Sequence, residues 1–220
     1  MIQRSSPGKE LRVDLVFECT GMFTRRDDLE KHIRAGARFV LLSAPSHGGE
    51  AETVVHGANL PGGAPIIISC ASCTTNCITP IVEVIGRRIG VEKAVMTTLH
   101  AYTSSQSVVG LFDGIAVRAP VPIGSIADIT FLASRKTSVD EVNQILTEEA
   151  DTERYAGVLG VSRDPLVSSD IIGDPRASIV DLELTKVVDG DLVKVLSWYD
   201  NEWTYANQMI REARSMAGRR

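Results

Sequence analysis

The sequence has few aromatic residues and no long hydrophobic run. Phe, Trp and Tyr make up 5% of its 220 residues, so we expect a core of aliphatic side chains. No apolar stretch approaches the roughly 18 residues that span a bilayer. Residues 1–9 also lack the hydrophobic core of a secretion signal. These absences argue against a membrane-spanning helix and favour a cytoplasmic location.

Positive charge and cysteine are also scarce. Lys and Arg number 23 against 28 Asp and Glu, for a net charge of −5. Nucleic-acid grooves and polybasic membrane surfaces need clustered Lys and Arg, so we expect no nucleic-acid or membrane partner. The four cysteines include three between residues 70 and 77, which is too close for an ordinary disulfide framework. This spacing favours a reducing compartment.

The first third of the chain alternates strand and helix patterns. Val13–Cys19, Phe39–Leu42 and Pro65–Ser69 are short apolar runs, typical of strands buried in a parallel sheet. Between the first two runs, Arg25–Arg34 is charged with apolar residues four apart, which predicts an amphipathic helix. A strand-like segment is also expected at Thr53–His56. This order predicts an α/β unit built on a strand–helix–strand pattern.

The rest of the chain predicts a different unit. Helices are expected at 73–89 and 203–216, and Ser138 with Glu141 matches a capping box that opens a further helix. Strands are expected at 91–100, 111–119 and 125–133, and Asp189-Gly190 predicts the turn of a hairpin over 187–195. We therefore expect an α+β unit with a mainly antiparallel sheet behind the α/β unit.

The cysteine cluster lies where a buried strand passes into a helix. A thiol at a helix N-terminus experiences the positive end of the helix dipole, which favours the nucleophilic thiolate. Taken alone, the cluster supports a nucleophilic and a buried structural cysteine about equally. Its Cys-x2-Cys-x3-Cys spacing also matches part of an iron–sulfur pattern, but no fourth ligand follows nearby, so we expect no metal site. Cys19, Cys70 and Cys77 are expected to be buried structural thiols.

A nucleophilic thiol needs a base, and the chain has four histidines. His32 lies in a charged helix and is expected to face solvent, His47 lies in a loop, and His56 is expected to be an ordinary strand residue. His100 closes an apolar strand, where a titratable group is well placed to face a cleft. From its position alone, His100 is equally a candidate base and a hydrogen-bonded structural residue.

Three motifs give the sequence a recognisable family likeness. They are Ala71–Cys77 (ASCTTNC), Thr97–Thr103 (TTLHAYT) and Ser197–Glu202 (SWYDNE). In this order they resemble the glyceraldehyde-3-phosphate dehydrogenase family, and the likeness extends from about Val13 to Met216. The resemblance implies a partial Rossmann-type NAD-binding domain over residues 1–72 and 200–220. It also implies an α+β catalytic domain with a mainly antiparallel sheet over residues 73–199.

The resemblance also implies an activity. Cys73 is expected to be the nucleophile that forms a thiohemiacetal and then a thioester, with His100 as its general base. The reaction would be the phosphorylating oxidation of a small phosphorylated aldehyde, with inorganic phosphate as co-substrate and NAD or NADP as cofactor. Erythrose 4-phosphate is the alternative substrate to glyceraldehyde 3-phosphate. The family further implies a homo-oligomer, a homotetramer.

Binding residues follow by position in the same motifs. Ser72 and Thr74 match positions for the attacking phosphate, and Thr103 and Arg118 match positions for the substrate's own phosphate. The cofactor-binding positions are Thr20, Ser43 and Asn201. Without the resemblance, Arg118 is equally a surface arginine, and Asn201 is equally a helix N-cap.

Two departures from the family pattern argue against an active dehydrogenase. No Gly-x-Gly-x-x-Gly turn occurs in the sequence, and such a turn supplies backbone donors to a dinucleotide pyrophosphate. The stretch after His-Ala-x-Thr is also short, which predicts an internal deletion between Gly110 and Leu111. We therefore expect a chain truncated at its N-terminus and internally deleted. The second hypothesis is an inactive member of the family, a pseudoenzyme or interaction module.

Overall fold

The computed structural model describes residues 11–59, 61–63, 65–101 and 113–218. They form two compact units. One runs to Ser72 and resumes at Gln208, and the other is Cys73–Asn207. The last division lies within the closing helix α4 (Trp203–Gly218), whereas we expected a domain boundary between residues 199 and 200. No helix in the described part of the chain is long and apolar enough to cross a membrane.

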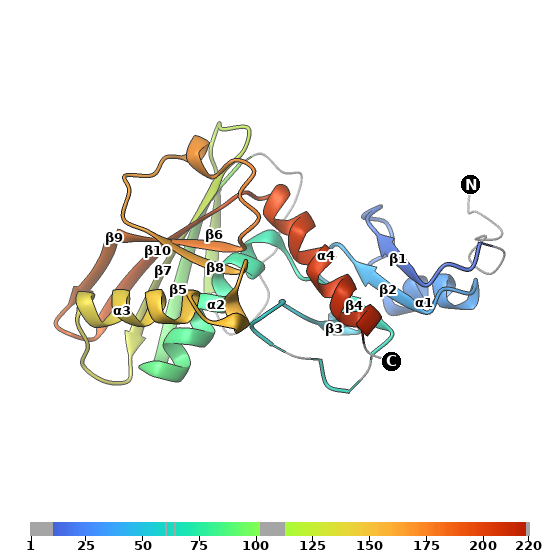
Figure 1. Cartoon of the computed structure of the whole chain (residues 1–220), viewed down its shortest axis with the longest axis horizontal. Coiled ribbons are helices and arrows are strands. Elements are labelled where there is room, and N and C mark those ends of the chain that lie inside the picture. Colours follow the sequence, from blue (N-terminus) through green and yellow to red (C-terminus); the bar gives the residue numbers. More distant parts are fainter. Residues whose placement is uncertain (1–10, 60, 64, 102–112, 219–220) are drawn as a thin grey trace. The chain divides into compact units, whose positions relative to one another are not determined.

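The first unit is a parallel four-stranded sheet in the order β1-β2-β4-β3. Helix α1 connects β1 to β2 and packs against β2 and β4, which gives the expected strand–helix–strand arrangement (Figure 1). Its apolar core joins Leu29 of α1 to Val40, Leu42 and Ile67 of the sheet. Strand β3 contains only Thr53 of the expected segment Thr53–His56, and His56 lies in a turn, so the expectation of a strand at His56 was wrong. The elements are β1 (Leu15–Glu18), α1 (Arg26–Arg34), β2 (Phe39–Leu42), η1 (His47–Gly49), β3 (Glu52–Thr53) and β4 (Ile67–Ser69).

The second unit contains a six-stranded sheet in the order β6-β5-β7-β10-β9-β8. The three inner pairings are antiparallel, and the two edge strands, β6 and β8, run parallel to their neighbours. The hairpin between β9 and β10 turns at Asp189 and Gly190, which have φ values of 50° and 80°. The strands are β5 (Val91–His100), β6 (Asp113–Arg118), β7 (Ser125–Ala133), β8 (Leu159–Ser162), β9 (Ser178–Val188) and β10 (Leu192–Tyr199).

Helices α2 (Cys73–Arg88) and α3 (Val139–Ala150) bury one face of this sheet (Figure 1). The alternating burial along β7 reflects this, because every second side chain points toward the helices. Ser138 caps α3 as expected, accepting a hydrogen bond from the backbone N–H of Glu141. Short 3-10 turns follow at Glu153–Tyr155 and Ser168–Ile171. The molecule is therefore mixed α/β, a partial Rossmann-type sheet followed by an α+β unit, and the expected fold class is confirmed.

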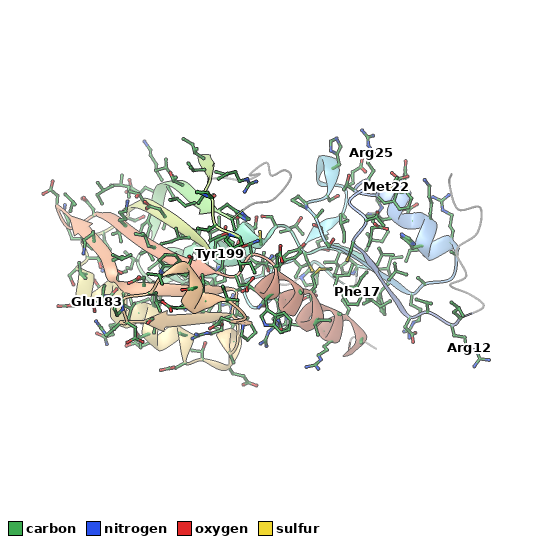
Figure 2. All side chains as sticks on the ribbon, turned by 90° about the horizontal axis from the view of Figure 1, so that it is seen from above. Arg12, Phe17, Met22, Arg25, Glu183 and Tyr199 are labelled. Atoms are coloured by element: carbon green, nitrogen blue, oxygen red, sulfur yellow. The ribbon has the colours of Figure 1, made fainter. Side chains whose placement is uncertain are left out.

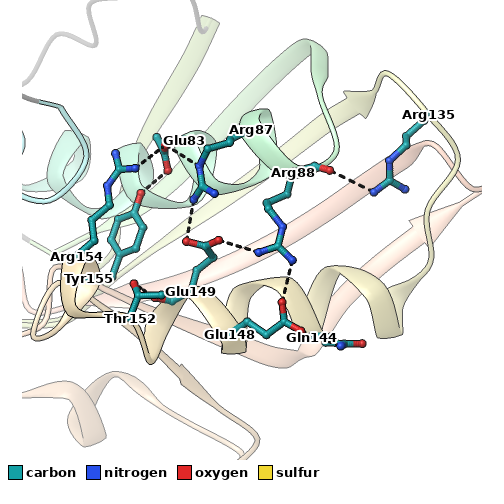
Figure 3. A network of polar contacts seen from close by, with 10 residues as sticks. All are labelled: Glu83, Arg87, Arg88, Arg135, Gln144, Glu148, Glu149, Thr152, Arg154 and Tyr155. Atoms are coloured by element: carbon teal, nitrogen blue, oxygen red, sulfur yellow. Dashed lines mark hydrogen bonds and ion pairs between the residues drawn. The ribbon is translucent and has the colours of Figure 1, made fainter.

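An ion-pair network joins α2 to α3 (Figure 3). Glu149 accepts hydrogen bonds from both Arg87, at 2.7 Å, and Arg88, at 2.8 Å. These bonds, first of all the one from Arg87, lower the pKa of Glu149 although its burial opposes them. Glu83 extends the network to Arg154 at 3.0 Å. The network fixes the two helices against each other on the sheet that carries the site.

Candidate active site

Cys73 is the first residue of α2 and follows β4 after a sharp turn. The turn is made by Ala71, whose φ of 58° lies in the left-handed region that residues with a Cβ rarely adopt. The Ser69 hydroxyl accepts the Ala71 N–H at 3.1 Å and supports this conformation. Cys73 is buried, with 8% of the residue exposed. Its thiol is therefore held at a helix N-terminus and largely shielded from water.

His100 ends β5 and faces the Cys73 thiol. Its Nε2 lies 3.2 Å from Sγ, and its Nδ1 lies 2.7 Å from the carbonyl oxygen of Ala101. Because a carbonyl only accepts, Nδ1 carries the proton and Nε2 is left as the acceptor toward the thiol. Burial lowers the pKa of His100, and the charge of Arg118 adds to this, while the bond to Ala101 opposes it. The arrangement keeps a neutral imidazole base against the thiol.

Two further residues contact this site, and the sequence did not identify them as site residues. Tyr199, at the end of β10, presents its ring edge to His100, with centroids 5.8 Å apart, and its hydroxyl lies 2.8 Å from Thr74 Oγ1. Tyr199 is buried, whereas Glu183 on β9 is exposed; both are labelled in Figure 2. Ser125, at the start of β7, is buried and accepts the Ala101 N–H at 3.1 Å. Ser125 lies in an expected strand and Tyr199 lies in the motif Ser197–Glu202, but neither pattern reveals the side-chain partners of these residues.

Arg118 lies beside the Cys–His pair. It pairs with His100 in the register of β5 and β6, and its Nη1 is buried with no hydrogen-bond partner among the described residues. A buried guanidinium nitrogen without a partner is suited to an anionic ligand. Ser72 is half-buried directly before α2, and Thr74 is buried within its first turn. The other expected phosphate-binding residue, Thr103, lies outside the described residues.

Asn201 follows β10 in the turn that leads to α4. The helix-capping role that its position suggested belongs instead to its neighbour: Asp200 Oδ1 accepts the backbone N–H of Glu202 at 3.0 Å and of Trp203 at 2.9 Å. Asn201 Oδ1 lies 3.4 Å from the Ser125 hydroxyl, and its Nδ2 is buried without a partner in the described part of the chain. This amide is thus available to a ligand.

The two other expected cofactor residues lie in the first unit. Thr20 follows β1 and Ser43 follows β2, so both lie at the carboxyl edge of the parallel sheet, where open α/β sheets bind ligands. The Thr20 hydroxyl donates to the buried Glu18 carboxylate. Glu18 also contacts His32, whose Nε2 lies 2.8 Å away and whose side chain is 17% exposed. The expectation that His32 faces solvent was therefore wrong, because Glu18 holds it against the sheet.

The remaining cysteines differ in exposure. Cys77 is fully buried, where desolvation raises the pKa of its thiol to about 12, and Cys70 is also buried with a raised pKa. Cys19 is exposed, so the expectation that it is buried was wrong: it follows the last residue of β1, where the chain leaves the sheet. Within the described residues, no group of three or more His, Cys, Asp or Glu could hold a metal ion.

Comparisons with known proteins agree with these motifs. A sequence model of the glyceraldehyde 3-phosphate dehydrogenase C-terminal domain matches residues 72–112 and 107–201. The chain is 38% identical to a glyceraldehyde-3-phosphate dehydrogenase of Zymomonas mobilis over 249 residues, covering 96% of this chain and 74% of that protein. It is 41% identical to one of Pseudomonas aeruginosa over 252 residues, covering 97% of this chain and 74% of that protein.

The number of matched segments and the length of the alignment are both relevant to the expected deletion. The family model matches in two segments that meet at residues 107–112, and the aligned span of 249 residues exceeds the 220 of this chain. The relative therefore carries residues within that span that this chain lacks. Identity over nearly the whole chain, together with the family-model match, establishes that this chain belongs to the glyceraldehyde-3-phosphate dehydrogenase family.

Proposed function

We propose that the chain is a phosphorylating aldehyde dehydrogenase that oxidises glyceraldehyde 3-phosphate through a covalent intermediate on Cys73. The observation that carries this proposal is the buried pair of Cys73 Sγ and His100 Nε2, 3.2 Å apart. This geometry matches the requirement of nucleophilic catalysis, in which a base lies within hydrogen-bond reach of the nucleophile. Ala101 holds the base in the tautomer that can accept the thiol proton.

The chemistry of the pair follows from its geometry. His100 Nε2 takes the proton of Cys73, the thiolate attacks the aldehyde carbon, and His100 returns the proton to the aldehyde oxygen, which gives a thiohemiacetal. His100, neutral again, is then positioned to take the hydroxyl proton as the carbon is oxidised to the thioester. Phosphate attack on the thioester carbon releases the acyl phosphate and returns the Cys73 thiolate. The lowered pKa of His100 keeps the imidazole unprotonated near neutral pH, as a base requires.

The phosphate ligands are proposed as follows. Arg118 binds the substrate's own phosphate with Thr103, and the unpaired Arg118 Nη1 supports this role. Ser72 and Thr74 bind the attacking phosphate beside Cys73. The first set combines a guanidinium with a hydroxyl and the second has two hydroxyls, and both kinds of group are donors to phosphate.

A nicotinamide dinucleotide is the proposed cofactor, either NAD or NADP, and it supplies the hydride acceptor when bound. The buried, unpartnered Nδ2 of Asn201 fits the oxygen of a carboxamide, because an amide N–H₂ otherwise remains unsatisfied there. Thr20 and Ser43 are proposed for the same cofactor from their place at the carboxyl edge of the first sheet. We assign the first unit, with the closing helix, as the partial dinucleotide-binding domain.

The second unit is proposed to assemble with copies of itself. The side chains on the sheet face opposite α2 and α3 include five exposed aliphatic residues on β5, β6 and β10. They are Val95, Leu99, Ile115, Val117 and Leu192. We call these residues the outer-face patch. Several exposed apolar side chains on one face of a sheet are typical of an association surface, which supports a homo-oligomer.

The assay of this proposal compares turnover of two cysteine variants. Oxidation of glyceraldehyde 3-phosphate with phosphate and either NAD or NADP should be lost, by at least about a thousandfold, in Cys73→Ser. Cys77→Ser, one helical turn away, should retain most of the activity. Faster turnover of erythrose 4-phosphate would reassign the substrate. No turnover of either aldehyde by the wild-type chain would favour the inactive family member.

A further inference from the structure

The Ser125 hydroxyl has no role in the proposed chemistry, but it lies between two residues that do, Ala101 and Asn201. Ser125 is 1% exposed and begins β7 directly after Gly124. Gly124 has a φ of 91°, and a Cβ there would lie 2.6 Å from the carbonyl oxygen of Ser168. The glycine is therefore needed for the path of the backbone into β7, and that path places Ser125 between Ala101 and Asn201.

The hydrogen-bond capacity of Ser125 determines where its proton goes. A serine hydroxyl has one proton and two lone pairs. It accepts the Ala101 N–H at 3.1 Å, lies 3.4 Å from Asn201 Oδ1, and also forms a hydrogen bond with the Tyr199 hydroxyl, which can donate to its second lone pair. An amide oxygen has no proton to give, so the bond to Asn201 takes the proton of Ser125. The hydroxyl thus accepts a hydrogen bond from Ala101, just after β5, and donates one to Asn201, in the turn after β10.

This bond leaves the nitrogen end of the Asn201 amide free. The oxygen and nitrogen of an amide exchange places by a half-turn of the side chain, and a hydroxyl can donate to the oxygen or accept from the nitrogen; in the structure the oxygen faces Ser125. With Oδ1 bonded to Ser125, Nδ2 points away as a buried donor without a partner among the described residues. Asp200 caps α4, so Asn201 is not needed for the helix.

We propose that Ser125 is a positioning residue whose hydroxyl orients the Asn201 carboxamide, so that Nδ2 is presented as a donor to the carboxamide oxygen of the nicotinamide. The inference rests on the proposed function for the identity of that ligand. The orientation of the amide itself does not depend on it. Ser125 also joins this side of the pocket to the base, because Ala101 gives its N–H to Ser125 and its carbonyl oxygen to His100.

The experiment compares Ser125→Ala with Ser125→Thr, which keeps the hydroxyl. Dissociation constants for NAD are measured by calorimetry, and the Asn201 side-chain amide is followed by nitrogen–proton NMR without any ligand. The Asn201 signals are identified by their loss in Asn201→Asp. Ser125→Ala should move these signals and weaken NAD binding about tenfold, as expected for a lost orienting hydrogen bond. Ser125→Thr should bind within about twofold of the wild type.

A double-mutant cycle distinguishes an effect on the orientation of the Asn201 amide from a general disturbance of the structure. In the Asn201→Asp background, Ser125→Ala should weaken NAD binding by no more than about twofold further, because its target amide is gone. Unmoved Asn201 signals in Ser125→Ala, or fully multiplicative effects in the cycle, would overturn the proposal. If Ser125→Ala does not fold, Ser125→Cys keeps the volume and weakens the donor, with the same expected directions. A wild type that binds no NAD contradicts the proposed function, while the NMR comparison still decides the role of Ser125.

Discussion

At the scale of single residues, His100 owes its properties to burial and to the bond from Nδ1 to Ala101. The exposed fraction of His100 is 0%, and burial lowers its pKa while Arg118 adds to the effect. The folded chain therefore holds the imidazole neutral at a pH where an unfolded chain already binds a proton. The burial that keeps His100 an unprotonated base therefore also makes the unfolding free energy of the protein depend on pH.

The pH dependence of stability should reveal this residue. Below the unfolded pKa of about 6.5, the unfolded chain binds a proton that folded His100 does not, so the unfolding free energy falls as pH falls. The slope contributed by His100 is at most about 1.4 kcal/mol per pH unit. Urea unfolding of His100→Asn between pH 7 and pH 5 should show a shallower decline than the wild type.

The control for that measurement is His47→Asn, since His47 is exposed. Its decline should match that of the wild type. Parallel declines for the wild type and His100→Asn would contradict the account of a desolvated, neutral imidazole.

The sequence identified single residues as candidates for the site only where they lie in a segment that resembles the family. The motifs identified Cys73, His100, Arg118 and Asn201 as candidates, and their side-chain roles remain proposals. Strand and helix patterns could not identify the partners of Ser125, because its contacts come from residues 24 and 76 positions away. In the same way, the charged helix around His32 gave no sign of Glu18, which lies 14 positions earlier.

At the scale of elements, the turn before β7 determines where the strand enters the site. Gly124 and Gly173 both have positive φ values, 91° and 80°, but only at Gly124 would a Cβ meet nearby atoms. Gly173→Ala should lose about 1 kcal/mol, the cost of a left-handed alanine. Gly124→Ala should lose a further 1–3 kcal/mol or so, because the backbone must shift away from Ser168.

Urea unfolding of the two variants measures this difference directly. Equal losses for both glycines would contradict the close approach of the turn to Ser168. A larger loss at Gly173 would do so as well.

The helices were predictable from local patterns, whereas β8 and most of β9 were not predicted. Periodicity and turn residues identified α1, α2, α3 and α4 within one or two residues at most ends, because capping and apolar spacing are local properties. The Asp189-Gly190 hairpin was identified for the same reason. The parallel pairing of the edge strands β6 and β8 was not, since strand order depends on contacts between distant segments.

At the scale of the whole molecule, the outer-face patch makes association the expected state. Ile115, at 66% exposure, is the most exposed of its residues. Ile115→Glu places a charge in an apolar contact and should shift the mass measured by light scattering toward the monomer. Val167→Glu, at a site 56% exposed outside the patch, should leave the mass unchanged.

A wild-type mass equal to that of one chain would contradict the proposed homo-oligomer. So would a mass that Ile115→Glu and Val167→Glu change equally.

The domain boundaries remain a prediction that rests on the order of the family motifs along the chain. The predicted boundary lies at 199/200, whereas the compact units divide at 207/208, within α4. The amino-acid composition of a continuous helix does not change at the residue where the helix passes from one compact unit to the other.

The central claim is that Cys73, with His100 as its base, forms the acyl thioester. The most direct measurement runs the phosphate step backwards, without any dinucleotide. The chain is mixed with 3-phosphoglyceroyl phosphate, and the acylated residue is identified by mass spectrometry. The account predicts one acyl group per chain, on Cys73, and acylation at least about a hundredfold slower in His100→Asn. Acylation of Cys70 or Cys77, or an equal rate in His100→Asn, would contradict it.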